Sequence, residues 1–258
     1  ARRALAEPGP TDTFDGADAA LADAAGRPDL LGSLLRVVAA DGTLVEPGAP
    51  AARWDDLVAE AVPGDPAPRP YLVALGPDRG RYRVGPVAQL RIGPLTTPVA
   101  AGLQEQWLAA GGGAHAARAV IAVHSVEAIG VLLGQGALVH GPAARPVAAF
   151  TRHPVGIGWV DGPRGLLVHR YAVDERGTVT AATILTPTAQ NEPWLAALLA
   201  TAAGVDQAGA TVSALDMEDA IREADPCLPC SSAPAGTMGL QVDSVPVGAP
   251  TGTTTRSA

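Results

Sequence analysis

The hexapeptide Asp225-Pro226-Cys227-Leu228-Pro229-Cys230 contains both cysteines of this 258-residue chain. Two thiolates separated by two residues bind one soft metal ion, form a reversible disulfide, or supply half of a tetrahedral metal site. The sequence on either side of the pair must therefore distinguish among these kinds of chemistry.

The position of the pair relative to the predicted helices argues against two common uses. A helix predicted over residues 216–224 ends before Pro226, which prevents Asp225 from continuing it. Cys227 thus follows the end of a helix, whereas a thioredoxin-like pair lies at a helix N-terminus, where the dipole stabilises the thiolate. A closed zinc site needs two more ligands. The histidines, at positions 115, 124, 140, 153 and 169, form no suitable pair.

Composition narrows the function classes further. The formal charge is -8, and all 18 basic residues are scattered arginines, so no nucleic-acid surface is expected. Two cysteines do not make a disulfide scaffold. We find no signal-like segment near Ala1 and no apolar run approaching the roughly 20 residues that cross a bilayer. These features favour a cytoplasmic protein without a membrane span.

Apolar periodicity and turn residues predict a mainly α fold with small antiparallel β hairpins, an α+β arrangement. Helices are expected over residues 17–25, 99–109, 114–133, 190–203 and 216–224, hairpins over 34–45 and 166–185, and an extended arm over 81–88. We expect one compact unit over 17–242, a disordered segment or fragment edge over 1–16, and a flexible tail over 243–258. Because the first residue is Ala1 and not Met, we expect a fragment of a longer protein.

Three motifs occur in a fixed order around the second predicted hairpin. Gly162-Pro163-Arg164-Gly165 precedes it, Thr186-Pro187-Thr188-Ala189-Gln190-Asn191 follows it, and the cysteine hexapeptide comes roughly 35 residues later. In this order they resemble the C-terminal portion of the large, catalytic subunit of nickel-iron hydrogenases. The cytosolic, cofactor-coupled branch, which is NAD-reducing-like, is the most similar. Further upstream, Leu35-Arg36-Val37-Val38, Pro70-Tyr71-Leu72 and Tyr82-Arg83-Val84-Gly85-Pro86 resemble the same family, so the likeness covers residues 30–242.

The resemblance implies a role for each motif. Cys227 would be a terminal thiolate on nickel, and Cys230 would bridge nickel and iron, because soft sulfur ligands bind both metals. The iron of this family carries carbonyl and cyanide ligands. Arg164 would lie beside the iron, and Thr188 would donate its hydroxyl to a cyanide, with Pro187 next to it.

The implied reaction is reversible heterolytic cleavage of dihydrogen, with the proton taken by a thiolate or by the arginine. No cysteines remain to bind iron-sulfur clusters, so electrons must pass to an iron-sulfur small subunit. In the branch that this chain resembles, further diaphorase-type subunits pass electrons to NAD.

The chain also departs from the family pattern at three places. The family's second C-x-x-C pair, near its N-terminus, is absent here, so two of four thiolates would have to come from polypeptide outside this sequence. Ala233 stands where the family usually has a histidine three residues after the last cysteine. Asp161-Gly162 stands where the family commonly has Glu-Ala.

Other interpretations therefore stay open. The chain is either part of a hydrogenase catalytic subunit or a non-catalytic, hydrogenase-like scaffold subunit that has lost the metal site. A stand-alone redox or zinc-binding C-x-x-C module is a third possibility. Taken residue by residue, Arg164 would otherwise pair on a turn and Thr188 would cap a helix. His169 would be structural, and His124 and Glu127 would lie on a solvated helix face.

Overall fold

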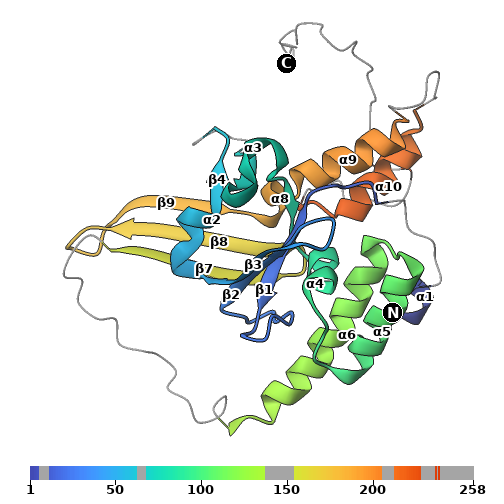
Figure 1. The fold of residues 1–258 in the computed structure, drawn as a ribbon, viewed down its shortest axis with the longest axis horizontal. Coiled ribbons are helices and arrows are strands. Elements are labelled where there is room, and N and C mark those ends of the chain that lie inside the picture. Colours follow the sequence, from blue (N-terminus) through green and yellow to red (C-terminus); the bar gives the residue numbers. More distant parts are fainter. Residues whose placement is uncertain are drawn as a thin grey trace, which may run out of the picture.

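The computed structural model describes residues 1–5, 12–62, 68–136, 154–204, 212–227, 236 and 238. Figure 1 shows the strands beside a group of helices, and among the described residues the strands form a four-stranded, a two-stranded (β4-β5) and a three-stranded sheet. The helices are α1 (Arg2–Leu5), α2 (Trp54–Leu57), α3 (Gly76–Arg79), α4 (Pro86–Ile92), α5 (Pro98–Ala110), α6 (Ala114–Leu133), α8 (Pro187–Gln190), α9 (Glu192–Ala202) and α10 (Ala214–Ala224), with short 3-10 turns η1 (Ala51–Arg53) and η2 (Val73–Leu75). The strands are β1 (Ala17–Ala22), β2 (Leu34–Val38), β3 (Leu44–Pro50), β4 (Val58–Glu60), β5 (Pro70–Leu72), β6 (Tyr82–Arg83), β7 (Val155–Gly162), β8 (Gly165–Val173) and β9 (Val179–Leu185).

The first sheet has the strand order β3-β2-β1-β6. The hairpin expected over residues 34–45 is confirmed as β2 and β3, which pair antiparallel. The helix expected over residues 17–25 is wrong, because Ala17–Ala22 is strand β1, antiparallel to β2 and parallel to β6. All six residues of β1 are buried. Burial between two strands outweighs the high helix propensity of alanine, which is only a weak local preference.

The second sheet has the order β7-β8-β9 and contains the other expected hairpin, formed by β8 and β9. Strand β7 was not expected. Its sequence, Val-Gly-Ile-Gly-Trp-Val-Asp-Gly, has glycines where a strand usually has larger side chains, and it pairs with β8 along its whole length. The tight turn between Gly162 and Gly165 places Pro163 and Arg164 at the end of this sheet.

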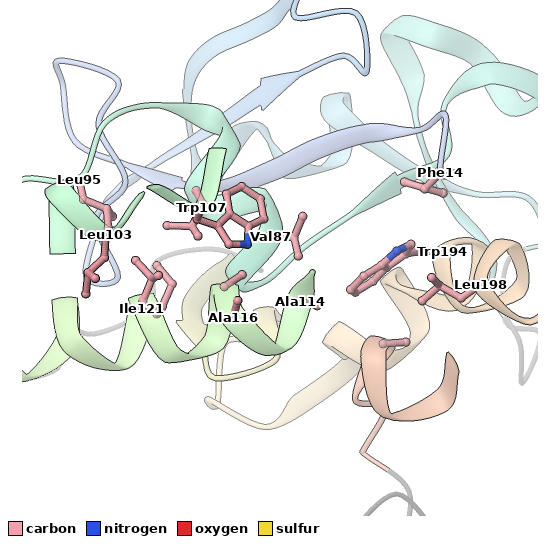
Figure 2. Close-up of a cluster of buried hydrophobic side chains, with 14 of the residues drawn as sticks. Phe14, Val87, Leu95, Leu103, Trp107, Ala114, Ala116, Ile121, Trp194 and Leu198 are labelled. Atoms are coloured by element: carbon pink, nitrogen blue, oxygen red, sulfur yellow. The ribbon is translucent and has the colours of Figure 1, made fainter. Parts of the chain in front are cut away.

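The helices enclose the main apolar cluster, of which Figure 2 draws 14 residues around Trp107 and Trp194. The helices expected over 99–109, 114–133 and 216–224 are confirmed as α5, α6 and α10. Helix α6 is, among the described residues, the one helix long and apolar enough to span a membrane by length and composition. Its first half packs inside this cluster, with Ala117 and Val120 fully buried. Only 28% of the helix's apolar window is buried, and Val126, Val131 and Leu133 in the second half are exposed. This helix therefore corrects the expectation that no apolar run approaches the length of a membrane span.

The N-terminal part of the chain contributes to the folded body before residue 17. Phe14 is buried in the cluster of Figure 2. The buried guanidinium of Arg83 donates to Asp18 at 2.6 Å and to Asp12 at 2.7 Å, and it lies over the ring of Phe14. Ala4 and Leu5 of α1 also pack against this cluster. The interpretation of residues 1–16 as disordered is therefore corrected for residues 1–5 and 12–16. Residues 243–258, the expected tail, lie outside the described residues.

The fold as a whole is mixed α and β. The expectation of small antiparallel β elements is confirmed. The description as mainly α understates the strands, because β1 and β7 complete sheets that the sequence indicated only as hairpins.

Two glycine turns meet backbone to backbone and fix the position of Arg164. Gly85, between β6 and α4, has φ +100, and Gly165, at the start of β8, has φ +121. A Cβ atom on Gly165 would lie 2.5 Å from Val84 Cγ2 and 2.6 Å from the Gly85 nitrogen. Only glycine tolerates both the backbone angle and this approach.

We predict that Gly165→Ala lowers the free energy of unfolding by about 2–4 kcal/mol, because it adds strain at positive φ to a steric clash. Urea denaturation of the chain measures this loss. The matched control is Gly156→Ala on β7, where an added Cβ meets nothing within 4 Å. Equal stabilities of the two variants would contradict the packing described for the turn.

Candidate functional site

Two buried amide side chains join the motifs that the sequence singled out. Gln190 accepts a hydrogen bond from the Tyr82 hydroxyl at 3.2 Å and donates to the carbonyl of Leu166 at 2.5 Å. Asn191 accepts from the Val84 N–H at 2.8 Å and donates to the Arg164 carbonyl at 3.4 Å. Both side chains are buried, so these hydrogen bonds lie away from solvent. The strand-turn at residues 82–86, the Arg164 turn and the 186–191 segment are therefore held as one unit.

Arg164 reaches from this unit to the end of α10. Its Nε donates to the Asp225 carbonyl at 3.0 Å, and its Nη2 donates to Asp225 Oδ1 at 3.3 Å. The sequence also allowed Arg164 to pair within its own turn. It does not, because its partner Asp225 lies 61 positions away in the sequence. The Arg164 side chain is 38% exposed, so the ion pair is reachable from outside.

Asp225 is the site residue that sequence reasoning missed. It ends α10 with φ 48 and ψ 53, a left-handed conformation that is uncommon for a residue with a side chain. This backbone turn directs both its carbonyl and its carboxylate to Arg164. The Asp-Pro pair after the predicted helix was the sequence signal for this turn. Asp tolerates the left-handed conformation better than most residues, and Pro226 cannot extend a helix.

Thr188 contacts the start of the cysteine motif. Its hydroxyl oxygen accepts the Cys227 N–H at 3.0 Å. The expectation that Thr188 would cap a helix is wrong, because Thr186 is the N-cap of α8 and accepts the Ala189 N–H. Since the Thr188 oxygen accepts from Cys227, its own O–H proton remains available to donate to another acceptor.

The structure thus brings Arg164, Thr188 and Cys227 to one place, although they come from three separate motifs. A small cavity there is lined in part by Arg164, Thr188, Asn191, Asp225 and Pro226. Pro187 begins α8 directly before Thr188, and the Cys227 thiol is free and exposed. Cys230, the second predicted metal ligand, lies outside the described residues, as does Ala233. Among the described residues, no group of three or more His, Cys, Asp and Glu side chains forms a metal site.

The residues that were given structural roles keep them, with one correction. His169 Nδ1 lies 2.8 Å from the Tyr171 hydroxyl on the same strand. His124 and Glu127 do not form a solvated face. His124 is buried and its Nδ1 lies 2.8 Å from Thr97 Oγ1, and Glu127 accepts the N–H groups of Val99 and Ala100 at the start of α5. A carboxylate at a helix N-terminus is electrostatically favourable, which explains this arrangement.

Helix α10, which leads to the cysteine motif, also binds the segment that follows that motif. The Glu218 carboxylate is buried and accepts the N–H of Gly236 at 2.6 Å and the N–H of Met238 at 2.9 Å. Arg222 donates to the same carboxylate at 3.2 Å. These contacts attach the segment around Gly236 and Met238 to the helix that precedes the cysteine motif. Burial raises the pKa of Glu218, but these hydrogen bonds outweigh it and hold that pKa below its usual value.

We predict that Glu218→Gln speeds amide hydrogen exchange at Gly236 and Met238 by about tenfold, since an amide offers one acceptor oxygen in place of two and about 1.4 kcal/mol is lost. Hydrogen-exchange mass spectrometry measures this. Asp219→Asn, an exposed change at the next position, is the control and should leave these amides unchanged. Unaltered exchange in Glu218→Gln would contradict the attachment.

Comparison with known proteins agrees with the family indicated by the motifs. No family model matches the chain. The chain is similar to the NAD-reducing hydrogenase HoxS subunit beta of Cupriavidus necator, with 33% identity over 192 residues, covering 67% of this chain and 38% of that protein. It is also similar to a subunit of the F420-non-reducing hydrogenase of Methanothermobacter marburgensis, with 27% identity over 216 residues, covering 79% of this chain and 45% of that protein.

Among solved structures, the chain matches the crystal structure of an NAD+-reducing NiFe hydrogenase in the H2-reduced state. The TM-score is 0.72 at 31% identity, covering 83% of this chain and 50% of that chain. The NiFeSe hydrogenase of Dm. baculatum matches with a TM-score of 0.51 at 18% identity, covering 84% of this chain and 52% of that chain, which shows the fold alone. The chain therefore spans between 38% and 52% of the length of these relatives. Its relatives are hydrogenase subunits, and its fold is a hydrogenase fold.

Proposed function

We propose that this chain is the C-terminal portion of the large subunit of a nickel-iron hydrogenase of the NAD-reducing-like branch. The reaction proposed is reversible heterolytic cleavage of dihydrogen. The observation that carries the proposal is that Arg164 and Thr188 line one small cavity together with Asp225 and Pro226, and that Thr188 accepts the N–H of the next residue, Cys227. The likeness to the HoxS subunit beta and to the NAD+-reducing hydrogenase structure supports the branch.

The donor chemistry of this cavity fits part of a nickel-iron centre. The exposed Cys227 thiol is a soft ligand of the kind that nickel and iron accept, and Cys230 follows three residues later. The described residues supply this one thiolate and no cluster of further ligands. The proposal therefore requires Cys230 of this chain as a second thiolate. It also requires two more thiolates, which would come from polypeptide outside this sequence. When bound, the centre would supply the metal chemistry that polarises dihydrogen.

Each residue at the cavity has a role that follows from its contacts. Thr188 holds the Cys227 amide and keeps its O–H proton free to donate to a cyanide ligand, with Pro187 setting the start of its helix. Asp225 holds Nε and Nη2 of Arg164, and among the described residues Nη1 has no hydrogen-bond partner. A permanent positive charge is thus fixed on Asp225, two residues before Cys227, where it would stabilise negative charge during the reaction.

We further propose that the electron acceptor is an iron-sulfur small subunit, that diaphorase-type subunits pass the electrons to NAD, and that the location is cytoplasmic. The HoxS relative is described as NAD-reducing, which supports this partner set. Purification of the native complex that contains this chain tests it. A complex with nickel, iron and hydrogen-dependent NAD reduction supports the proposal. A complex with neither metal would favour the scaffold role, and one equivalent of zinc alone would favour a zinc module.

We predict that Cys227→Ser in that complex removes most of the bound nickel, because a serine oxygen is a poor ligand for a soft site. Inductively coupled plasma mass spectrometry measures nickel per complex. Thr201→Ser, an exposed change on α9, controls for handling. Nickel retained at the wild-type level in Cys227→Ser would exclude Cys227 as a ligand.

We predict that Arg164→Lys keeps the metals but lowers hydrogen uptake by at least about 100-fold, because an ammonium cannot reproduce the planar fork that binds Asp225 and still presents free donors. The matched control is Arg170→Lys on the adjoining strand β8, whose exposed pairing with Asp55 lies away from the cavity. Equal hydrogen uptake by the two variants would remove Arg164 from the site.

A further inference from the structure

A second cavity lies beside the turn that carries Arg164. Its volume is about 410 Å³, and its wall includes Gly162 and Pro163 of that turn, Arg118 of α6, and Asp225. Apolar side chains make up much of the remaining wall, from Leu30, Pro86, Ile121 and Ala122. The cavity therefore lies beside the turn that carries Arg164, and its wall is mostly apolar.

One of these polar groups is the carboxyl of Asp161, at the end of β7, which also lines the cavity. Asp161 is only 6% exposed. Its Oδ2 accepts the Leu21 N–H at 3.1 Å, while Oδ1 has no hydrogen-bond partner in the described residues. Burial raises the pKa of Asp161 to about 6, even though the Leu21 contact lowers it. A buried carboxyl with an open oxygen can accept a proton without losing an existing hydrogen bond.

The neighbouring Gln89 on α4 is the second unsatisfied group. Its side chain is buried, and neither its amide nitrogen nor its oxygen has a partner of good geometry among the described residues. It still lies close enough to lower the pKa of Asp161. Buried amides without partners are rare and costly, so they often mark a place where water is bound. Gln89 and Asp161 thus place three buried polar atoms without partners behind the cavity wall, of which Asp161 is the residue that lines the cavity.

The other charged groups around Asp161 are already paired. Asp18 of β1 pairs with Arg83, and Arg91 of α4 pairs with Asp18. Arg53 of η1 pairs with Glu46, and Arg170 of β8 pairs with Asp55. Of the histidines, His169 contacts Tyr171 and His124 contacts Thr97. Arg118 and Asp225 share the cavity. Arg118 donates to the carbonyls of Glu223 and Arg222 at 3.0 Å, which leaves its charge facing the carboxyl groups there.

We propose that Asp161 is a proton acceptor of the hydrogen-splitting reaction, a proposal that rests on the function proposed above. A proton that enters the cavity beside Pro163 and Asp225 passes through cavity water to the Asp161 carboxylate, which becomes a neutral carboxylic acid and later returns the proton to water. No electrons move in this step. A carboxyl that titrates near neutral pH serves well as both acceptor and donor.

The ordinary alternative is that Asp161 only holds the Leu21 N–H. Asp161→Asn separates the two roles, because the amide oxygen still accepts that hydrogen bond but the side chain no longer titrates. Asp161→Glu restores a carboxyl at the same place. Asp78→Asn, the same chemical change at an exposed position on α3, is the control.

The first measurement needs no metal. In pH-difference infrared spectra of the full chain, wild type minus Asp161→Asn should give a protonated-carboxyl band that disappears with a midpoint near pH 6. Wild type minus Asp78→Asn should give none with that midpoint. If no band titrates between about pH 5 and 7, the proposal fails while the hydrogenase function stands.

The second measurement uses the native complex. At unchanged nickel and iron content, Asp161→Asn should slow hydrogen-deuterium exchange between dihydrogen and water by at least about 10-fold and increase the solvent isotope effect, and Asp161→Glu should recover most of the rate. Wild-type rates in Asp161→Asn would overturn the proposal. A wild-type complex without nickel and iron would instead overturn the proposed function, and this proposal with it.

Discussion

The site depends on two amide side chains, Gln190 and Asn191, that are buried between three parts of the chain. A buried polar group that loses its hydrogen bond costs about 1–3 kcal/mol, so removing either amide would destabilise this region. Four of their hydrogen bonds reach Tyr82, Val84, Arg164 and Leu166, and a fifth reaches the Thr186 carbonyl within the same segment. Because an amide offers both a donor and an acceptor in a fixed plane, these bonds restrict the relative placement of the three segments.

Close backbone packing completes this constraint. The Gly85 and Gly165 turns touch where side chains would not fit, so the Arg164 turn cannot shift along β6 without a clash. From this fixed base, Arg164 extends to Asp225, and Thr188 reaches Cys227 from the helix that Gln190 ends. The Thr188 contact is exposed, whereas the amides behind it are buried. The interior therefore provides the rigidity, and the surface-facing side chains provide the chemistry.

Much of this arrangement could be predicted from the sequence. The two hairpins and helices α5, α6 and α10 follow from periodicity and turn residues, and the order of the three motifs indicated the hydrogenase relatives. Strand β1 could not be predicted, because Ala17–Ala22 looks helical by local propensity and becomes a strand only through burial on both sides. The contact of Arg164 with Asp225 could not be predicted either: the Asp-Pro pair indicated a turn after the helix, but the pairing itself spans 61 positions. Long-range polar contacts leave no local pattern, and this is why Asp161 and Gln89 were not singled out for function.

The most direct test of the central claim is a crystal structure of the native complex with anomalous data collected at the nickel absorption edge. We expect a nickel peak bonded to the Cys227 sulfur, with the Thr188 hydroxyl and the Arg164 guanidinium on the neighbouring iron side. A Cys227 sulfur far from any metal, in a complex whose metal lies elsewhere or is absent, would contradict the account.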